Sequence, residues 1–495
     1  MRLRAVFKFL SLTAFIISCG MAIIFFVSAV VERQDSSDRP ALIRAVFAGF
    51  AVAAALGRAG KGSDMSRMRT RDMLASVAMS WITASAIGAL PYWFYGAAPT
   101  YTDAFFESMS GFTTTGATIF PNLDSLPKCL LAWRALTHWL GGMGIIVLTL
   151  AMMPSAGKGG LQMFGAESTG ITPEKLTPRL QQTALYLWLI YMALTAALII
   201  LLSAGGMSVF DALAHSMAAI STGGFSTHSL NTAYFHSAYH EWILTLFMFL
   251  SGANFVLHFK ALKGLSLKSF VTDPEFLFYS ASVSAITLML SANLYFTGAY
   301  SSFMVSLRTG AFHVMSFMTT TGFVSANYDR WPSFSRALLF ICLFLGGCAG
   351  STAGGIKQIR LMIMLGHARR HLSRILNPRS VAVLPAGESQ LDSAAISSCF
   401  AFFGLYFLVF VCGAFAVSLF GNDIITSLSG AASALGNVGP AFGRLGASDN
   451  FSKQAQAAKW IYSFLMFCGR LELYTVLALF SGTFRRDVMT EERPD

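Results

Sequence analysis

The chain has 495 residues, of which 55% are apolar and only 12% are charged. Soluble domains carry roughly 25% charged residues, so this composition excludes a soluble protein and predicts a polytopic membrane protein surrounded mostly by lipid. The net charge of +11 could suggest a nucleic-acid partner, but the basic residues gather near the ends of apolar segments, so no nucleic acid is expected. The seven cysteines include no Cys-x-x-Cys pair, which argues against a secreted disulfide scaffold.

Ten segments are apolar and long enough to cross a bilayer, which takes about 20 residues. The first begins like a signal peptide, yet its apolar run continues to Val31 with no obvious cleavage site before Glu32, so a retained helix is expected. The ten segments are 6–31, 40–57, 73–95, 129–153, 182–203, 241–261, 275–296, 334–365, 394–420 and 459–482. Four shorter, less apolar stretches end in Thr and Gly, near 102–118, 209–227, 306–325 and 422–443.

The basic residues predict the topology. Of the 35 Lys and Arg residues, 23 fall in six clusters, which the positive-inside rule places in the cytoplasm. The clusters are the N-terminus, 58–72, 153–183, 257–274, 357–380 and the C-terminus. Successive clusters must be separated by an even number of crossings. The four shorter stretches are therefore expected to enter from outside and return as re-entrant pore loops, with both termini in the cytoplasm.

The unit of helix, pore loop and helix occurs four times after an initial helical hairpin. In three loops a methionine lies seven residues before the last glycine, at Met109, Met217 and Met315. The fourth loop fits with a small insertion, which aligns Asn437 with Thr114. The predicted fold is an all-α polytopic membrane protein with four helix–pore-loop–helix repeats around a central pore. Its expected divisions are a hairpin at 1–60 and repeats at 61–153, 154–264, 265–366 and 367–495.

The ends of the four loops have the chemistry of a cation filter. A dehydrated cation needs oxygen ligands, and rings of backbone carbonyls supply them without fixed charge. Glycine permits the backbone angles that turn carbonyls inward, and a short helix directs its negative end at the ion. One such loop could equally be a helix capped by glycine, but four copies at matched spacing favour the filter. The candidate filter residues are Thr114, Thr115, Gly116, Thr222, Gly223, Gly224, Thr320, Thr321, Gly322, Asn437, Val438 and Gly439.

The eighth segment, 334–365, is interrupted by five glycines between 346 and 355. Each glycine disfavours a helix by up to roughly 1 kcal/mol relative to alanine, and irregular backbone at membrane depth is tolerated only against protein or water. The stretch is therefore expected beneath the filter, with a packing kink between close helices as the alternative. Arg470, near the middle of the last segment, should face the bundle interior as a positive barrier, a latch or a structural ion pair.

Several stretches resemble the Trk/Ktr/HKT superfamily of potassium transporters, in particular its bacterial TrkH branch, and the resemblance covers nearly the whole chain. The stretches are 110–118, 133–144, 221–227, 252–258, 346–357, 436–440 and 469–472. The resemblance implies potassium selectivity, because all four filter glycines are present and Gly116 stands where the plant sodium-selective branch has serine. Departures are minor: Ala353 and Ala441 stand where many relatives have glycine.

The resemblance also implies that the glycine-rich loop obstructs the permeation path and moves on opening, with Arg470 contacting it. Lys357, at the exit of this loop, is a weaker candidate, since it could be a positive-inside anchor. The candidate gate residues are Gly346, Gly347, Gly350, Ser351, Thr352, Gly354, Gly355, Lys357 and Arg470.

These observations predict potassium uptake across the bacterial inner membrane by an ion-conducting subunit. A potassium symporter coupled to sodium or protons on the same scaffold is the alternative. An enzyme is not expected, because the chain has no His-Glu-x-x-His, Gly-x-Ser-x-Gly or complete P-loop motif. Potassium would be the substrate, with no cofactor. The cytoplasmic loops are too short for a nucleotide-binding domain, and the resemblance implies a cytosolic TrkA-like nucleotide-binding subunit and a homodimer within membrane lipid.

Overall fold

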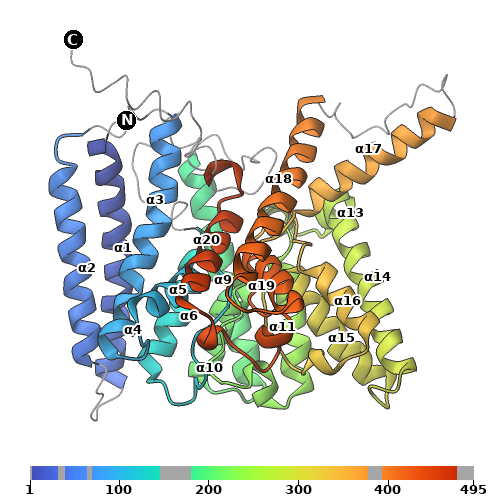
Figure 1. The fold of residues 1–495 in the computed structure, drawn as a ribbon, viewed down its shortest axis with the longest axis horizontal. Coiled ribbons are helices and arrows are strands. Elements are labelled where there is room, and N and C mark those ends of the chain that lie inside the picture. Colours follow the sequence, from blue (N-terminus) through green and yellow to red (C-terminus); the bar gives the residue numbers. More distant parts are fainter. Residues whose placement is uncertain are drawn as a thin grey trace.

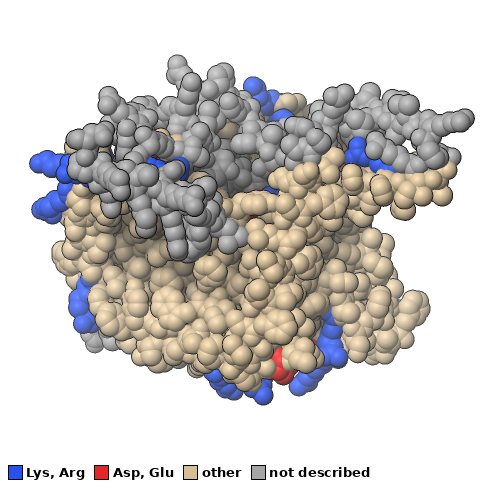
Figure 2. Space-filling view, turned by 45° about the horizontal axis from the view of Figure 1, so that its top comes forward, with Lys and Arg blue, Asp and Glu red and all other residues tan. Residues whose placement is uncertain are grey.

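The computed structural model describes residues 3–31, 39–63, 68, 70–144, 180–376 and 393–476. Within these ranges helices are the only regular secondary structure apart from an isolated bridge between Leu345 and Ile356. This confirms the all-α prediction. Six described helices are long and apolar enough to cross a membrane, or seven if a bent pair counts as one span. Figure 1 shows the long helices side by side in one bundle. Figure 2 shows a broad band of the described surface with few charges and with Lys and Arg toward its edges.

The N-terminal hairpin packs against the first repeat. It consists of α1 (Leu3–Val31) and α2 (Arg39–Ala59). Glycines set the close approach of its helices: a Cβ on Gly49 would lie 2.4 Å from Ser18 Oγ, and one on Gly60 would lie 2.6 Å from the Lys8 backbone nitrogen. Close packing through small residues is the usual means of helix association in lipid.

Four units follow (Figure 1), and each contains a helix of 12 to 16 residues on one of the four Thr- and Gly-ended stretches. The first unit contains α3 (Thr70–Gly88), α4 (Leu90–Tyr95), α5 (Tyr101–Phe112) and α6 (Lys128–Gly142). The second contains α9 (Leu180–Ala204), α10 (Val209–Ile220), α11 (Ala238–Ser251) and α12 (Phe255–Gly264). The third, preceded by α13 (Lys268–Thr272), contains α14 (Pro274–Phe296), α15 (Phe303–Met318), α16 (Ser333–Cys342) and α17 (Gln358–Leu376). The fourth contains α18 (Ser393–Ser418), α19 (Ile424–Gly436) and α20 (Gln456–Arg470).

The short helices α5, α10, α15 and α19 fall on the four stretches that the sequence singled out. Polar caps fix where three of them begin. The Thr100 and Ser208 hydroxyls accept from the backbone N–H of Asp103 and Asp211 and donate to those carboxylates in return. Asp423 accepts from the first turn of α19 in the same way. Such caps satisfy N–H groups that a helix start leaves unpaired.

Three of the ten expected spans are broken earlier than the sequence predicted. In place of a continuous span over 129–153, α6 ends at Gly142. In place of a continuous span over 241–261, α11 and α12 meet at 96°, because the Asn254 side chain accepts from Val256 N and starts a new helix. In place of a continuous span over 459–482, α20 ends at Arg470, and Glu472 and Leu473 follow with positive φ of 49° and 23°. Residues 145–153 and 477–482 of two expected spans lie outside the described residues. The same is true of the basic stretch before α9 and of the basic C-terminus.

A buried ion pair holds the last helix against the first short helix. Lys459 of α20 lies 2.5 Å from Asp103 of α5, and both side chains are 3% exposed. Gln456 also donates to Asp103 at 3.1 Å, and Lys459 donates to Ser452 O at 3.0 Å. The pair joins residues 356 positions apart, so it fixes the fourth unit against the first.

Replacing Lys459 with methionine should strongly lower the stability of the protein. The change leaves the Asp103 charge buried without its partner, which typically costs about 3–5 kcal/mol. Thermal unfolding in detergent should show a clear fall in the midpoint for Lys459→Met and almost none for Lys453→Met, because Lys453 is exposed. The double variant Asp103→Asn with Lys459→Met should recover much of the loss. Equal midpoints for the two single variants would contradict the structural role of the pair.

Candidate functional site

Each short helix ends in the same backbone turn. Its first residue is not glycine yet has a left-handed φ, at Thr114 (52°), Thr222 (54°), Thr320 (57°) and Asn437 (55°). Two residues later comes a glycine with positive φ, at Gly116 (81°), Gly224 (78°), Gly322 (79°) and Gly439 (98°). A non-glycine residue in this region costs of order 1–3 kcal/mol and persists only when its surroundings enforce it. Four equivalent cases indicate one shared structural requirement.

The four turns meet in a closed ring. A Cβ on Gly116 would lie 2.2 Å from Gly223 O, and one on Gly224 would lie 1.9 Å from Thr321 O. The ring continues through the other two segments: a Cβ on Gly322 would lie 2.1 Å from Val438 O, and one on Gly439 would lie 2.3 Å from Thr115 O. Each glycine therefore touches the carbonyl of the next segment in order, and the fourth segment returns to the first. No side chain fits at these contacts.

The carbonyl oxygens of this ring are available to a ligand. No hydrogen bond between described residues is directed at the oxygens of Thr115, Gly223, Thr321 and Val438, although buried carbonyls in proteins are normally paired. On one side of the ring lies a hollow of about 110 Å³, lined among others by Gly116, Gly322, Gly439 and His228. The arrangement offers a set of neutral oxygen ligands that a small cation can approach from this hollow.

A buried ion pair supports the ring behind the first and second segments. Arg134 of α6 lies 2.8 Å from Glu107 of α5, and the two side chains are 2% and 0% exposed. Arg134 donates to Ser226 O at 2.9 Å and lies 3.9 Å from the Phe225 ring centroid. Glu107 accepts from Ile119 N at 2.8 Å. The pair therefore holds the chain that follows each of the two turns.

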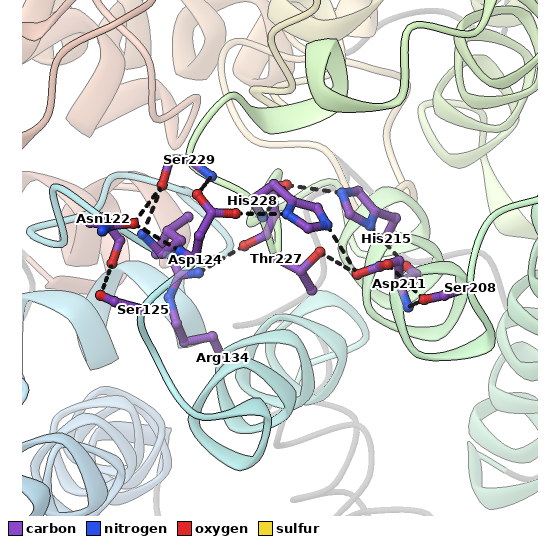
Figure 3. Close-up of polar contacts among 12 residues, drawn as sticks. Asn122, Asp124, Ser125, Arg134, Ser208, Asp211, His215, Thr227, His228 and Ser229 are labelled. Carbon is purple, nitrogen blue, oxygen red and sulfur yellow. Dashed lines mark hydrogen bonds and ion pairs between the residues drawn. The ribbon is translucent and has the colours of Figure 1, made fainter.

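Polar contacts on the neighbouring loops join the same two segments (Figure 3). His228 Nδ1 lies 2.8 Å from the Asp124 carboxylate, and Ser229 N donates to that carboxylate at 3.2 Å. The Thr227 hydroxyl donates to Asp211 at 2.6 Å. Hydrogen bonding from Ser229 holds the pKa of the Asp124 carboxyl below its ordinary value, so Asp124 remains an ionised acceptor at neutral pH.

The glycine-rich segment between α16 and α17 contacts residues at the ends of α15 and α19, whereas the hollow is lined by the ring glycines and residues that follow them. It folds back on itself, with Gly346 N donating to Ile356 O and Ile356 N to Phe344 O, both at 2.9 Å. It touches the third turn, where Gly354 N donates to Thr320 Oγ1 at 2.6 Å. It also touches the fourth unit, since a Cβ on Gly354 would lie 2.4 Å from Gly436 O. The interruption predicted within 334–365 is thus confirmed.

Arg470 contacts both the glycine-rich segment and its surroundings. Its guanidinium donates to Thr352 O at 3.1 Å, to Gly141 O at 2.6 Å and to Gly142 O at 2.9 Å. It also donates to Thr114 Oγ1 at 3.3 Å, at the start of the first turn. The side chain faces the bundle interior as expected, but Arg470 ends its helix and does not lie in the middle of a span. The guanidinium thereby adds side-chain donors to carbonyls at the end of α6, one of which, Gly141 O, also accepts from Gly144 N.

Lys357 does not face the membrane surface. It is 1% exposed and its ammonium donates to Ala353 O. The alternative of a positive-inside anchor therefore does not fit, because such an anchor needs contact with water or lipid head groups.

The ring consists of the residues predicted as the filter, and the predicted gate residues lie in or against the glycine-rich segment. Three acidic side chains near the ring and the glycine-rich segment were not predicted from the sequence. Glu107 pairs with Arg134, Glu472 pairs with Arg360, and Glu275 binds the glycine-rich segment. A signal was present, because acidic residues inside apolar stretches of a membrane protein usually have a buried partner.

Comparisons with known proteins agree with this geometry. A family model named TrkH and described as "Cation transport protein" matches residues 40–490. The Trk system potassium uptake protein TrkH of Escherichia coli strain K12 is 38% identical over 490 residues, which cover 98% of this chain and 100% of that protein. The TrkH protein of Halomonas elongata is 39% identical over 85% of this chain and 87% of its own length. The crystal structure of the potassium transporter TrkH from Vibrio parahaemolyticus superposes with a TM-score of 0.86 at 33% identity, over 98% of this chain and 100% of that one.

Proposed function

The chain belongs to the TrkH family of cation transport proteins, and from this premise we propose that it is the ion-conducting subunit of a potassium uptake system. This family consists of transporters and not enzymes. The names of the relatives, potassium uptake proteins of Trk systems, support potassium as the substrate. The observation that carries the proposal is the closed ring in which four glycines touch four backbone carbonyls.

The ring acts as a selectivity filter in this proposal. Its carbonyl oxygens replace part of the hydration shell of a potassium ion without adding fixed charge that would trap the ion. The four short helices end at the ring, so the negative ends of their dipoles lie near the bound cation. Each segment contributes only the few residues between its left-handed turn and its glycine. Such a short filter should discriminate less sharply against sodium than a longer one.

The glycine-rich segment acts as the gate. It contacts Thr320 and Gly436, at the ends of two of the short helices, whereas the hollow is lined by the ring glycines and residues that follow them. In this proposal an ion that enters the ring from the hollow must pass the segment when it leaves. Arg470 holds it through Thr352 O and places a positive charge beside the path. Both effects oppose conduction in the conformation described above.

We place the chain in the bacterial inner membrane with both termini in the cytoplasm. The six Lys and Arg clusters support this orientation by the positive-inside rule. The relatives' names describe parts of a system, which supports a separate regulatory component. We therefore propose a cytosolic TrkA-like nucleotide-binding subunit on the basic face and a homodimer of this chain in the bilayer. No cofactor is needed for conduction.

A reversal-potential measurement in proteoliposomes separates conduction from coupled symport. With potassium as the only alkali cation present, an uncoupled conductor carries current without sodium and reverses at the potassium Nernst potential whatever the proton gradient. We expect this result for the purified chain. A current that requires sodium, or a reversal potential that shifts with the proton gradient, would establish the symporter instead.

Replacing Gly116 with serine should lower the preference for potassium over sodium severalfold. The new Cβ would lie 2.2 Å from Gly223 O, so the first and second segments must separate and their carbonyls must move. The matched control is Gly96→Ser, because Gly96 has the same φ of 81° with nothing within 4 Å of an added Cβ. Bi-ionic reversal potentials measure both variants. An unchanged ratio in Gly116→Ser would mean that the first segment does not line the filter.

Deleting several residues within 348–354 should raise rubidium uptake into liposomes in the absence of any partner subunit. The deletion removes the obstruction while the ring itself remains. Size-exclusion chromatography and the thermal midpoint must first show that the variant is folded. Unchanged or abolished uptake in a folded variant would reduce the segment to a packing element.

A further inference from the structure

Besides Arg470, a second acidic or basic side chain binds the backbone of the glycine-rich segment. Glu275 lies in the first turn of α14, directly after Asp273 and Pro274, and is 8% exposed. Its Oε1 accepts from Ala349 N at 2.7 Å and from Ile359 N at 3.1 Å. Ala349 belongs to the glycine-rich segment, whereas Ile359 lies in the first turn of α17. One carboxylate oxygen therefore joins the segment to a fixed helix start.

The contact of Ala349 with Glu275 lies between two backbone contacts of the same segment. Three consecutive residues of the segment each make one bond to another part of the chain, two of them to the second unit and one to α14. Cys348 N donates to Gly252 O at 2.8 Å, and Gly350 O accepts from Phe255 N at 3.0 Å. These two bonds join backbone to backbone at the break between α11 and α12. The bond of Ala349 to Glu275 lies between them and is the one of the three that uses a side chain.

The carboxylate suits both of its donors. A negative charge at a helix N-terminus is favourable, and the N–H of Ile359 belongs to the start of α17. When Ala349 departs, the Glu275 side chain keeps the N–H of Ile359 as a partner, so Glu275 can release the segment without losing every hydrogen bond.

We propose that Glu275 is a positioning residue that holds the glycine-rich segment in its obstructing conformation and thereby sets how often the transporter opens. The proposal rests on the gating role assigned to that segment above. Glu275 and Arg470 act on residues three positions apart: Glu275 accepts from the N–H of Ala349, and Arg470 donates to the carbonyl of Thr352. Conduction requires the segment to leave both.

The test measures rubidium uptake into proteoliposomes containing the full chain without a partner subunit. Glu275→Ala removes the acceptor and should raise uptake about tenfold, since a factor of ten corresponds to ~1.4 kcal/mol, close to one hydrogen bond to a charged group. Glu275→Gln keeps an oxygen acceptor without the charge, so its uptake should lie between wild type and Glu275→Ala.

The matched control is Asp273→Asn, which removes a charge at the same helix start but keeps the oxygen that accepts from Phe276 N. Its uptake should equal that of wild type.

The loop deletion within 348–354 separates two kinds of failure. If the deletion raises uptake but Glu275→Ala does not, the segment is a gate and Glu275 is not its positioning residue. If neither variant raises uptake, the gating role itself fails and the inference fails with it. Where Glu275→Ala does not fold, hydrogen–deuterium exchange of Glu275→Gln decides the question. Faster exchange confined to 346–357 supports the proposal, and unchanged exchange there overturns it.

Discussion

The close contact of bare backbone in the ring is the constraint on which the rest of the structure depends. At each of four positions an added Cβ would fall between 1.9 and 2.3 Å from a carbonyl oxygen of the next segment, so only glycine is tolerated. The carbonyls that result are buried, and no hydrogen bond between described residues is directed at them, which costs free energy in a protein without a ligand. A bound cation offsets that cost. The Lys459–Asp103 pair fixes the fourth segment against the first, and the Glu107–Arg134 pair supports the first and second segments.

The glycine-rich segment uses the same kind of contact as the ring. Gly347 and Gly354 approach the carbonyls of Gly252 and Gly436 so closely that neither can carry a side chain. Residues 346–355 carry no bulky side chain, so they fit tightly against the ring, yet they bury little apolar surface and gain little from that fit. Specific polar contacts must then hold the segment in place. Segments with few buried apolar contacts are also those that open locally at low cost, which is the property that a gate requires.

Local composition predicted most of the fold and the position of the site. The four short helices, their Thr- and Gly-containing ends and the interruption of the eighth segment all depend on residues that are neighbours in sequence. The left-handed φ of Asn437, 55° against 52° for Thr114, agrees with the alignment made for the fourth loop. The misses have a common cause. The break at Asn254, the end of α20 at Arg470 and the partners of Glu107 and Glu275 depend on contacts between distant parts of the chain, and hydropathy along the chain contains no information about them. The sequence predicts Arg470 in the middle of a span because the apolar run continues past it. In the structure α20 ends at Arg470, and the guanidinium binds carbonyls of α6.

Two of the charged groups around the glycine-rich segment are arranged so that it can move without leaving either charge unpaired. Arg470 retains Gly141 O and Gly142 O when Thr352 departs, and Glu275 retains Ile359 N when Ala349 departs. Lys357 differs, because it would lose Ala353 O and the charges around it are of both signs: Glu472 and Glu275 attract it, whereas Arg470 and Arg360 repel it. Breaking a buried pair outright costs roughly 3–5 kcal/mol, which would make opening rare. Because Arg470 and Glu275 each have one partner in the segment and others in the helices around it, release at these two groups costs about one hydrogen bond each instead of a buried charge, as the proposed gating role requires.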